Sequence, residues 1–257
     1  MQELVVIGAG NVATHLAIAL QKKGVHIRQV VSRTEASAQA LAKTLSTSYT
    51  CKKNEVYTDA DIYICCVKDS EIATALAGIP LQNKVVLHTA GSVSIDVLRP
   101  FSSNFGVLYP LQTFSKSKTV DWQNIPLYIE GNSTETTEKI HTLATLLSNK
   151  VQVVNSDKRK DIHIAAVFSC NFVNHLYTLS AELLDKAGVD FKELLPLIQE
   201  TSEKLDTLTP FEAQTGPAMR NDTLIMEEHM AQLAKKDHNK AAIYALVSKS
   251  IFTTHHQ

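Results

Sequence analysis

A short run of residues near the N-terminus has the composition of a nucleotide-binding turn. Gly8, Gly10 and Ala13 form a G-x-G-x-x-A pattern, preceded by the apolar run 4–7 and followed by helical periodicity to about residue 23. In such turns the first glycine permits a tight bend, the second lets a pyrophosphate approach the backbone, and a small third residue allows close packing. The free N–H groups at the helix start favour a bound diphosphate. We therefore predict a dinucleotide site rather than a purely structural turn.

The end of the second predicted strand, 26–31, bears on which dinucleotide is bound. An NAD site normally has an acidic residue there, whereas this chain has Ser32-Arg33-Thr34. A guanidinium and two hydroxyls suit a 2′-phosphate, although a solvated surface arginine is the alternative. We favour the phosphate and expect NADP(H) as cofactor. The residues expected to bind it are Gly8, Ala9, Gly10, Asn11, Val12, Ser32, Arg33, Thr34, Val67, Lys68 and Thr89.

A second polar group lies on the long helix predicted at 159–186, which is otherwise apolar almost all round. His163, Asn171, Asn174 and Thr178 are separated by eight, three and four residues, so a regular α-helix would place them on one face. An imidazole suits proton transfer near neutral pH. We take His163 and Asn171 as candidate catalytic residues. The alternative for His163 is a structural hydrogen bond near the helix start.

Three further residues are candidate substrate ligands. His88 ends a predicted strand, where doubly wound sheets bind ligands, or it merely seals the strand end. Asn174 shares the polar face of the long helix. Arg220 follows a Gly-Pro turn and could bind a carboxylate, although a surface role is the alternative.

The elements that must position these residues change character along the chain. The first half alternates strands and helices, which is typical of parallel sheets. Strands are expected at 4–7, 26–31, 60–67, 84–88, 106–114, 126–130 and 151–154, with a less distinct one within 49–57. Helices are expected at 11–23, 35–45, 135–147, 159–186, 191–208, 223–235 and 238–252. The sequence predicts an α/β protein: an N-terminal Rossmann-type doubly wound parallel sheet over 1–155 and an all-helical substrate and dimerisation domain over 156–257.

Composition and charge limit the possible partners. The chain has 257 residues, 44% of them hydrophobic, and a formal net charge of −1, so we expect neither nucleic acid nor a membrane surface as a partner. Because Met1 leads almost directly into the first strand, we expect no signal peptide and a cytoplasmic location. The four cysteines form no C-x-x-C pair, and no H-E-x-x-H motif occurs, so no metal is expected.

Several motifs together resemble one protein family. They are Gly8-x-Gly10-x-x-Ala13, Ser32-Arg33-Thr34, His88-Thr89-Ala90-Gly91, Tyr109-Pro110-Leu111-Gln112-Thr113-Phe114, His163-Ile164-Ala165-Ala166-Val167-Phe168 with Asn171, and Thr215-Gly216-Pro217 with Arg220 and Asp222. The family consists of proteins assigned to the NADP oxidoreductases that pair a Rossmann-like domain with a domain of unknown function, DUF2520. The resemblance spans nearly the whole chain.

The family is similar in architecture to 6-phosphogluconate dehydrogenase, ketopantoate reductase and pyrroline-5-carboxylate reductase, whose helical domain dimerises and closes the active site over the nicotinamide. This similarity implies hydride transfer to or from a small carbonyl, imine or hydroxy-acid compound. Matching the second asparagine of ketopantoate reductase to Asn171 places its catalytic lysine at His163 and its first asparagine at Val167. The lysine of that enzyme is thus replaced by His163 and its first asparagine by Val167. Because these catalytic residues are missing, the alternative function is a non-catalytic NADP-binding protein that senses redox state or regulates a partner.

The length of the long helix bears on assembly. Residues 159–186 would form a helix of about 42 Å at 1.5 Å per residue. A helical domain of about a hundred residues can hardly cover so long an apolar helix by itself. We therefore expect a homodimer with twofold symmetry formed through the helical domain.

Overall fold

A sheet of eight strands forms the core of the first part of the chain in the computed structural model, which describes residues 2–115 and 118–256. By its internal contacts the chain divides into two compact units, Met1–Asn171 and Phe172–Gln257. The first contains every strand of the sheet, and the described residues of the second form helices joined by turns and loops.

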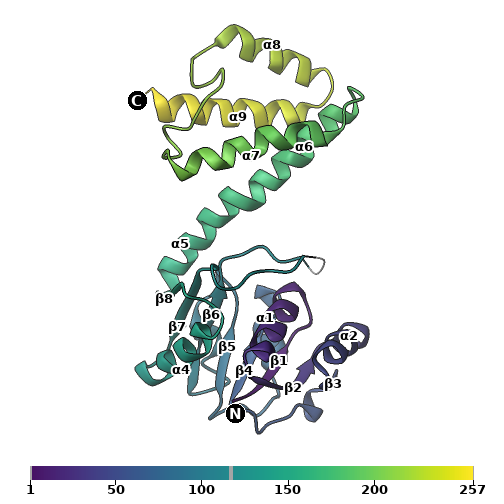
Figure 1. The fold of residues 1–257 in the computed structure, drawn as a ribbon, viewed down its shortest axis with the longest axis vertical. Coiled ribbons are helices and arrows are strands. Elements are labelled where there is room, and N and C mark those ends of the chain that lie inside the picture. The colour runs from purple at the N-terminus through teal and green to yellow at the C-terminus, as the bar shows by residue number, and fades with distance from the viewer. Residues whose placement is uncertain (1, 116–117, 257) are drawn as a thin grey trace. The chain divides into compact units, whose positions relative to one another are not determined.

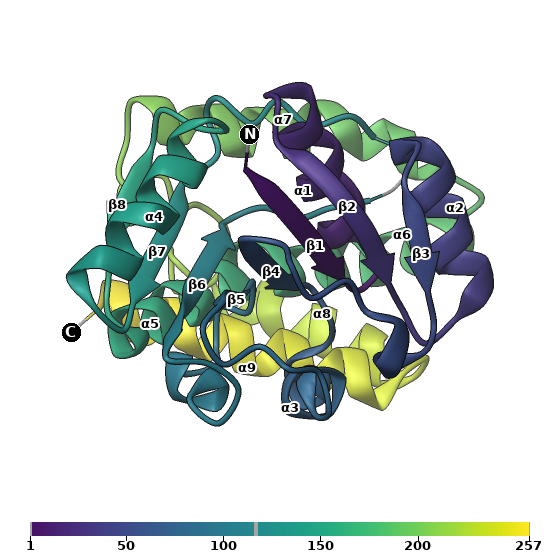
Figure 2. The ribbon, with the colours of Figure 1, turned by 90° about the horizontal axis from the view of Figure 1, so that it is seen from below.

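The sheet has the strand order β3-β2-β1-β4-β5-β6-β7-β8 (Figures 1 and 2). The strands are β1 (Glu3–Ile7), β2 (His26–Val31), β3 (Ser48–Thr50), β4 (Ile62–Cys65), β5 (Val85–His88), β6 (Asn104–Pro110), β7 (Leu127–Gly131) and β8 (Val151–Val153). Neighbouring strands are parallel except β6 and β7. The first six follow the 3-2-1-4-5-6 order of dinucleotide-binding folds, which reverses between β1 and β4. The predicted α/β, Rossmann-type class is therefore confirmed.

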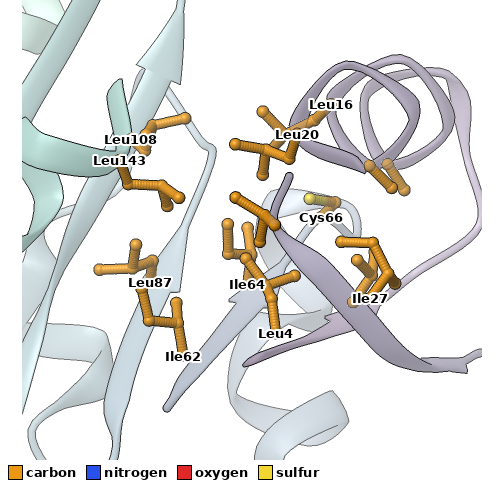
Figure 3. Close-up of a cluster of buried hydrophobic side chains, with 14 of the residues drawn as sticks. Leu4, Leu16, Leu20, Ile27, Ile62, Ile64, Cys66, Leu87, Leu108 and Leu143 are labelled. Carbon is orange, nitrogen blue, oxygen red and sulfur yellow. The ribbon is translucent and has the colours of Figure 1, made fainter. Parts of the chain in front are cut away.

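Both faces of the sheet are buried, because alternate residues of each strand point to opposite sides. Helices α1 (Asn11–Lys22), α2 (Glu35–Leu45) and α4 (Thr134–Thr145) cover one face, and the short α3 (Ile72–Leu76) lies on the other. Figure 3 shows the hydrophobic core between the sheet and the helices α1, α2 and α4, in which Leu16 and Leu20 of α1 approach strand residues such as Leu4 and Ile64. This packing holds the start of α1 rigidly beside the end of β1.

The long helix of the sequence prediction is divided in the structure. Helix α5 (Ser156–Ala166) begins one turn earlier than predicted, since the Asn155 side chain accepts a hydrogen bond from the backbone N–H of Lys158 at 2.9 Å. A π-helical segment, Val167–Phe172, then leads into α6 (Val173–Asp185). Hydrogen bonds from i to i+5 do not keep the 3.6-residue period. The expectation that His163 and Asn174 share one face therefore loses its basis.

Further helices follow α6 in the second unit, joined by turns and loops. These are α7 (Leu195–Glu203), flanked by the 3₁₀ turns Phe191–Leu194 and Lys204–Asp206, then α8 (Thr223–Ala234) and α9 (His238–His255). Asp222 caps α8 as its position suggests, by accepting from the N–H of Ile225 at 3.5 Å. Helices α8 and α9 pack against each other. Within the described part of the chain, no helix is both long and apolar enough to cross a membrane.

Candidate cofactor site and active site

The glycine-rich turn at the end of β1 leaves no room for a side chain at its first position. Gly8 has φ +115°, and a Cβ there would lie 2.6 Å from the carbonyl oxygen of Cys66. The backbone N–H of Gly8 donates to the carbonyl of Val31 at 2.7 Å, and that of Cys66 donates to Ile7 at 2.7 Å. The turn is thus fixed between the ends of β2 and β4, where only glycine fits.

The second glycine leaves open the space that an anion would occupy. Gly10 is the N-cap of α1, which has no side-chain cap, and a Cβ at Gly10 would meet no atom within 4 Å. The first N–H groups of α1 are therefore available to a ligand, and the helix dipole favours a negative one. These features fit the diphosphate of a dinucleotide.

A cavity of about 320 Å³ lies beside this turn. It is lined by Ile7, Gly8, Ala9, Gly10, Val31, Ser32, Arg33, Thr34, Cys51, Lys53, Cys66, Val67, Lys68, Glu71, Thr74 and Ala75. Most of the residues predicted to bind the cofactor are thus brought to one space. Asn11, Val12 and Thr89 are not among the lining residues. Asn11 donates to the carbonyl oxygen of Phe114 at 2.8 Å, and Val12 packs on the core.

Eight lining residues were not predicted. Ile7, Val31 and Cys66 stand at or just after the ends of strands, and the other five are Cys51, Lys53, Glu71, Thr74 and Ala75. These five come from short turns and from α3, which carry no nucleotide-binding motif in the sequence. The Lys53 ammonium donates to the backbone carbonyls of Thr74 and Ala77 at 2.7 and 2.8 Å, so it stabilises the end of α3. Lys53 therefore has a structural role, and Arg33 is the guanidinium of this cavity.

Arg33 has an acidic partner at the cavity. Its side chain is 81% exposed, and its guanidinium lies 2.9 Å from a carboxylate oxygen of Glu71. Exposed ion pairs contribute little to stability because water and salt screen them. Arg33 can therefore exchange the Glu71 carboxylate for a phosphate at small cost.

The candidate proton donor lies in a tight cluster of the first unit. The Nδ1 atom of His163 is 3.0 Å from the hydroxyl of Tyr109, and the two rings meet edge-on with centroids 5.9 Å apart. A Cβ at Gly91 would lie 2.6 Å from that nitrogen and 2.8 Å from Cζ of Tyr109. Glycine at position 91 is thus what allows His163 to reach Tyr109.

Tyr109 was not predicted as a site residue, although it belongs to a motif shared with the family. It is buried near the end of β6. Burial, aided by the nearby Asp69 carboxylate, raises the pKa of Tyr109 to about 12. Its hydroxyl therefore keeps its proton near neutral pH. The sequence signal was an aromatic residue with a polar tip at the carboxyl end of a sheet strand.

A buried ion pair fixes the helix that carries His163. Arg159, one turn before His163, is fully buried and pairs with the Glu130 carboxylate of β7. Its guanidinium also donates to the carbonyl oxygen of Val93 and to the Ser156 hydroxyl, and Ser156 donates to Glu130 at 2.8 Å. The first turn of α5 is thereby attached to β7 and to the loop after β5.

His88 lies at the end of β5, as predicted, but its side chain has no exposed surface. Its Nδ1 accepts from the backbone N–H of Ala90 at 3.1 Å. Burial, together with the charge of Arg159, lowers the pKa of His88 to about 3, so the imidazole is neutral. These contacts favour the structural alternative, in which His88 seals the strand end.

The remaining predicted residues are exposed. Asn171 lies in the π-helical segment at the end of the first unit. Asn174 on α6 and Arg220 in the loop before α8 belong to the second unit. Among the residues that the structure describes, no group of three or more His, Cys, Asp and Glu side chains is placed to hold a metal ion.

Comparisons with known proteins cover both parts of the chain. Residues 3–91 match the family described as NADP oxidoreductase, coenzyme F420-dependent, and residues 125–251 match DUF2520. A structure from Bacteroides fragilis, classed as an NADP oxidoreductase, is 44% identical with a TM-score of 0.91, and the match covers 98% of each chain. No curated protein matches the chain.

Two more distant structures share the fold. A Thermotoga maritima protein is 22% identical, with a TM-score of 0.82 and coverage of 99% of this chain and 100% of that chain. A reductive aminase from Aspergillus terreus, solved with NADPH and ethyl-5-oxohexanoate, is 15% identical, with a TM-score of 0.75 and coverage of 98% and 94%. The chain belongs to the NADP oxidoreductase family that joins a Rossmann-type, NAD(P)-binding domain to a DUF2520 domain.

Proposed function

We propose that this protein is an NADP(H)-dependent oxidoreductase that transfers hydride to or from a small carbonyl, imine or hydroxy-acid compound. The main support is the cavity in which the uncapped start of α1 and the Ser32-Arg33-Thr34 segment surround one space. A diphosphate suits the helix start, and a 2′-phosphate suits the guanidinium and the two hydroxyls.

The expected preference for NADPH follows from Arg33. A charge-assisted hydrogen bond contributes roughly 1.5–3 kcal/mol, which is about ten- to a hundredfold in affinity. NADPH should therefore bind at least tenfold more tightly than NADH, and Arg33→Ala should remove most of this difference. Isothermal titration calorimetry with both nucleotides measures it.

The control for this experiment is Arg99→Ala, which removes an exposed arginine paired with Asp96 outside the cavity. Arg99→Ala should leave both affinities unchanged, and NADH binding should be almost the same in all three proteins. Equal affinities for NADPH and NADH in the unaltered protein would contradict the role of Arg33.

Two observations support the proposed reaction: His163 is available as a proton donor, and the chain belongs to the NADP oxidoreductase family. In the reductive direction, NADPH held by the cavity residues would supply hydride to the carbon of a C=O or C=N bond. The oxygen or nitrogen then needs one proton, which His163 can provide, so the products are an alcohol or an amine and NADP⁺. The reductive aminase that shares the fold was solved with a keto ester, which supports carbonyl and imine compounds as the first class to test.

The hydrogen bond between His163 and Tyr109 also fits a purely structural histidine, which favours a non-catalytic NADP-binding protein as the second candidate. A screen of carbonyl, imine and hydroxy-acid compounds, followed by the absorbance of NADPH, separates the two. Turnover of any compound supports the enzyme. Tight NADPH binding without turnover across all three classes supports the second candidate.

We also propose that the protein is a homodimer formed through the helical unit. Ala218 is the sole buried hydrophobic residue among the described residues 172–256. Many large apolar side chains there are exposed instead: Phe172, Leu176, Leu183, Val189, Leu195, Leu197, Leu205, Leu208, Phe211, Met219, Leu224, Met230, Leu246 and Val247. A folded unit with so little core needs another apolar surface, and a second copy supplies a matching one.

Light scattering should therefore give twice the chain mass at micromolar concentration. Dilution in a sedimentation experiment should leave the dimer intact until far lower concentrations, because an interface of this character is typical of obligate assemblies. A folded monomer at micromolar concentration would contradict the proposal.

A further inference from the structure

We propose that Tyr109 is a positioning residue of the active site: its hydroxyl binds Nδ1 of His163 and thereby directs the proton of the imidazole to Nε2. This inference rests on the proposed function, in which His163 is the proton donor. It assigns the opposite side of the ring, the Nε2–H, to the substrate.

The geometry of Tyr109 and His163 shows that the hydrogen bond between them is made by Nδ1 of the imidazole. The hydroxyl oxygen lies 3.0 Å from Nδ1, within hydrogen-bond distance. A neutral imidazole carries its proton on one nitrogen, and the other nitrogen accepts hydrogen bonds. When the Tyr109 hydroxyl donates to Nδ1, the proton of the ring must be on Nε2.

The same contact survives when His163 becomes charged. A hydroxyl can both donate and accept, so the Nδ1–H of the imidazolium can donate to the oxygen of Tyr109. Tyr109 is suited to this role because its raised pKa keeps it a neutral phenol. The charged and polar groups that act on it are Asp69, Tyr128, Arg159 and Cys170. When the imidazolium gives its Nε2 proton to the substrate, the neutral ring keeps its other proton on Nδ1, and the oxygen of Tyr109 accepts a hydrogen bond from it. The ring therefore keeps its orientation during the transfer.

The surroundings of Tyr109 and His163 hold the two rings in place from both sides. The Tyr109 ring stacks on Tyr128 of β7, with centroids 6.4 Å apart. Arg159 holds the first turn of α5 by its buried ion pair with Glu130. Both partners of the hydrogen bond thus stand on elements attached to the same part of the sheet.

The absence of a side chain at Gly91 leaves the space in which Tyr109 and His163 meet. Unlike Gly8, it does not have a positive φ, so its backbone conformation is open to other residues. Space alone excludes them, since a Cβ would collide with both His163 and Tyr109. The glycine therefore serves the approach of these two side chains.

Tyr109→Phe tests the proposal, because it removes the hydroxyl and keeps the ring. Nitrogen NMR of protein labelled in its histidine rings reports the tautomer without any need for turnover. We expect His163 to be almost entirely the Nε2–H tautomer in the unaltered protein and a mixture in the variant. Turnover should fall about five- to tenfold, as expected for one neutral hydrogen bond, and its pH profile should shift, while KM for NADPH stays constant.

Two further variants make the test specific. Tyr128→Phe removes a hydroxyl from the same ring stack without altering the contact to His163, so the tautomer should be unchanged. Gly91→Ala should separate His163 from an intact Tyr109 and give the same mixture as Tyr109→Phe. A tautomer population and a pH profile that are identical in Tyr109→Phe and the unaltered protein would overturn the proposal.

The kinetics of His163→Ala distinguish failure of the proposed function from failure of the role given to Tyr109. If the His163→Ala protein turns over at the unaltered rate, His163 is not the proton donor, whatever the NMR spectra show. If that variant is inactive but Tyr109→Phe changes neither spectra nor pH profile, the enzyme assignment stands and the role of Tyr109 falls.

Discussion

Replacing His163 with alanine should reduce the turnover number by about 10²–10⁴-fold, the usual contribution of a positioned general acid. The affinity for NADPH should stay within a few-fold, because the predicted phosphate ligands line the cavity beside β1 and β2, of which His163 is not a part. Steady-state kinetics of carbonyl or imine reduction and calorimetry with NADPH measure the two quantities separately.

Asn174→Ala is the control for this prediction. Asn174 lies beyond the π-helical segment, so its loss should reduce turnover much less if the chemistry centres on His163. Asn171→Ala should have an intermediate effect if that residue orients the imidazole or the substrate. A His163→Ala protein that reacts at the unaltered rate would return His163 to a structural role.

The second large effect concerns stability. Glu130→Ala should lower the free energy of unfolding of the first unit by about 3–5 kcal/mol, because it leaves the fully buried Arg159 guanidinium without its counter-charge. The Nε of Arg159 already has no hydrogen-bond partner among the described residues, so the group has little compensation left. Urea unfolding followed by the fluorescence of Trp122, which lies in the same unit, measures the loss.

Glu135→Ala is the matched comparison. That residue forms an ion pair with Lys139 on the exposed face of α4, with its side chain 74% exposed, and its removal should barely move the unfolding midpoint. Glu130→Gln, which keeps a hydrogen-bond acceptor beside Arg159, should fall between the two. Equal midpoints for Glu130→Ala and Glu135→Ala would show that burial of the Arg159 pair carries no special weight.

The parts of the structure that the sequence predicted well are those encoded by neighbouring residues. The turn at Gly8 and Gly10 was predictable because the chemistry of a glycine depends on its immediate strand and helix. The Ser32-Arg33-Thr34 segment lines the same cavity as this turn, since the carboxyl ends of the parallel strands β1 and β2 lie side by side. The strand order of the Rossmann half follows from the same alternation of elements.

The contacts of the candidate active site could not be predicted, because they join residues that are far apart in the sequence. Arg159 and Glu130 are 29 residues apart, and Tyr109 and His163 are 54 apart, so no local pattern links them. A charged residue at a helix start is ordinarily solvated, so the sequence alone does not predict that Arg159 is buried. The π-helical segment at Val167–Phe172 was also hidden, because its residues have the same apolar composition as an α-helix.

The buried imidazole of His88 lowers the stability of the fold at acidic pH. With its pKa lowered to about 3, the folded chain leaves His88 unprotonated at pH 4 to 6, whereas an unfolded chain, with a histidine pKa near 6.5, binds a proton there. The unfolded state therefore gains about 1.4 kcal/mol for each pH unit below that value, until the folded side chain also titrates near pH 3. One side chain at the end of β5 thus couples the stability of the whole sheet to the proton concentration.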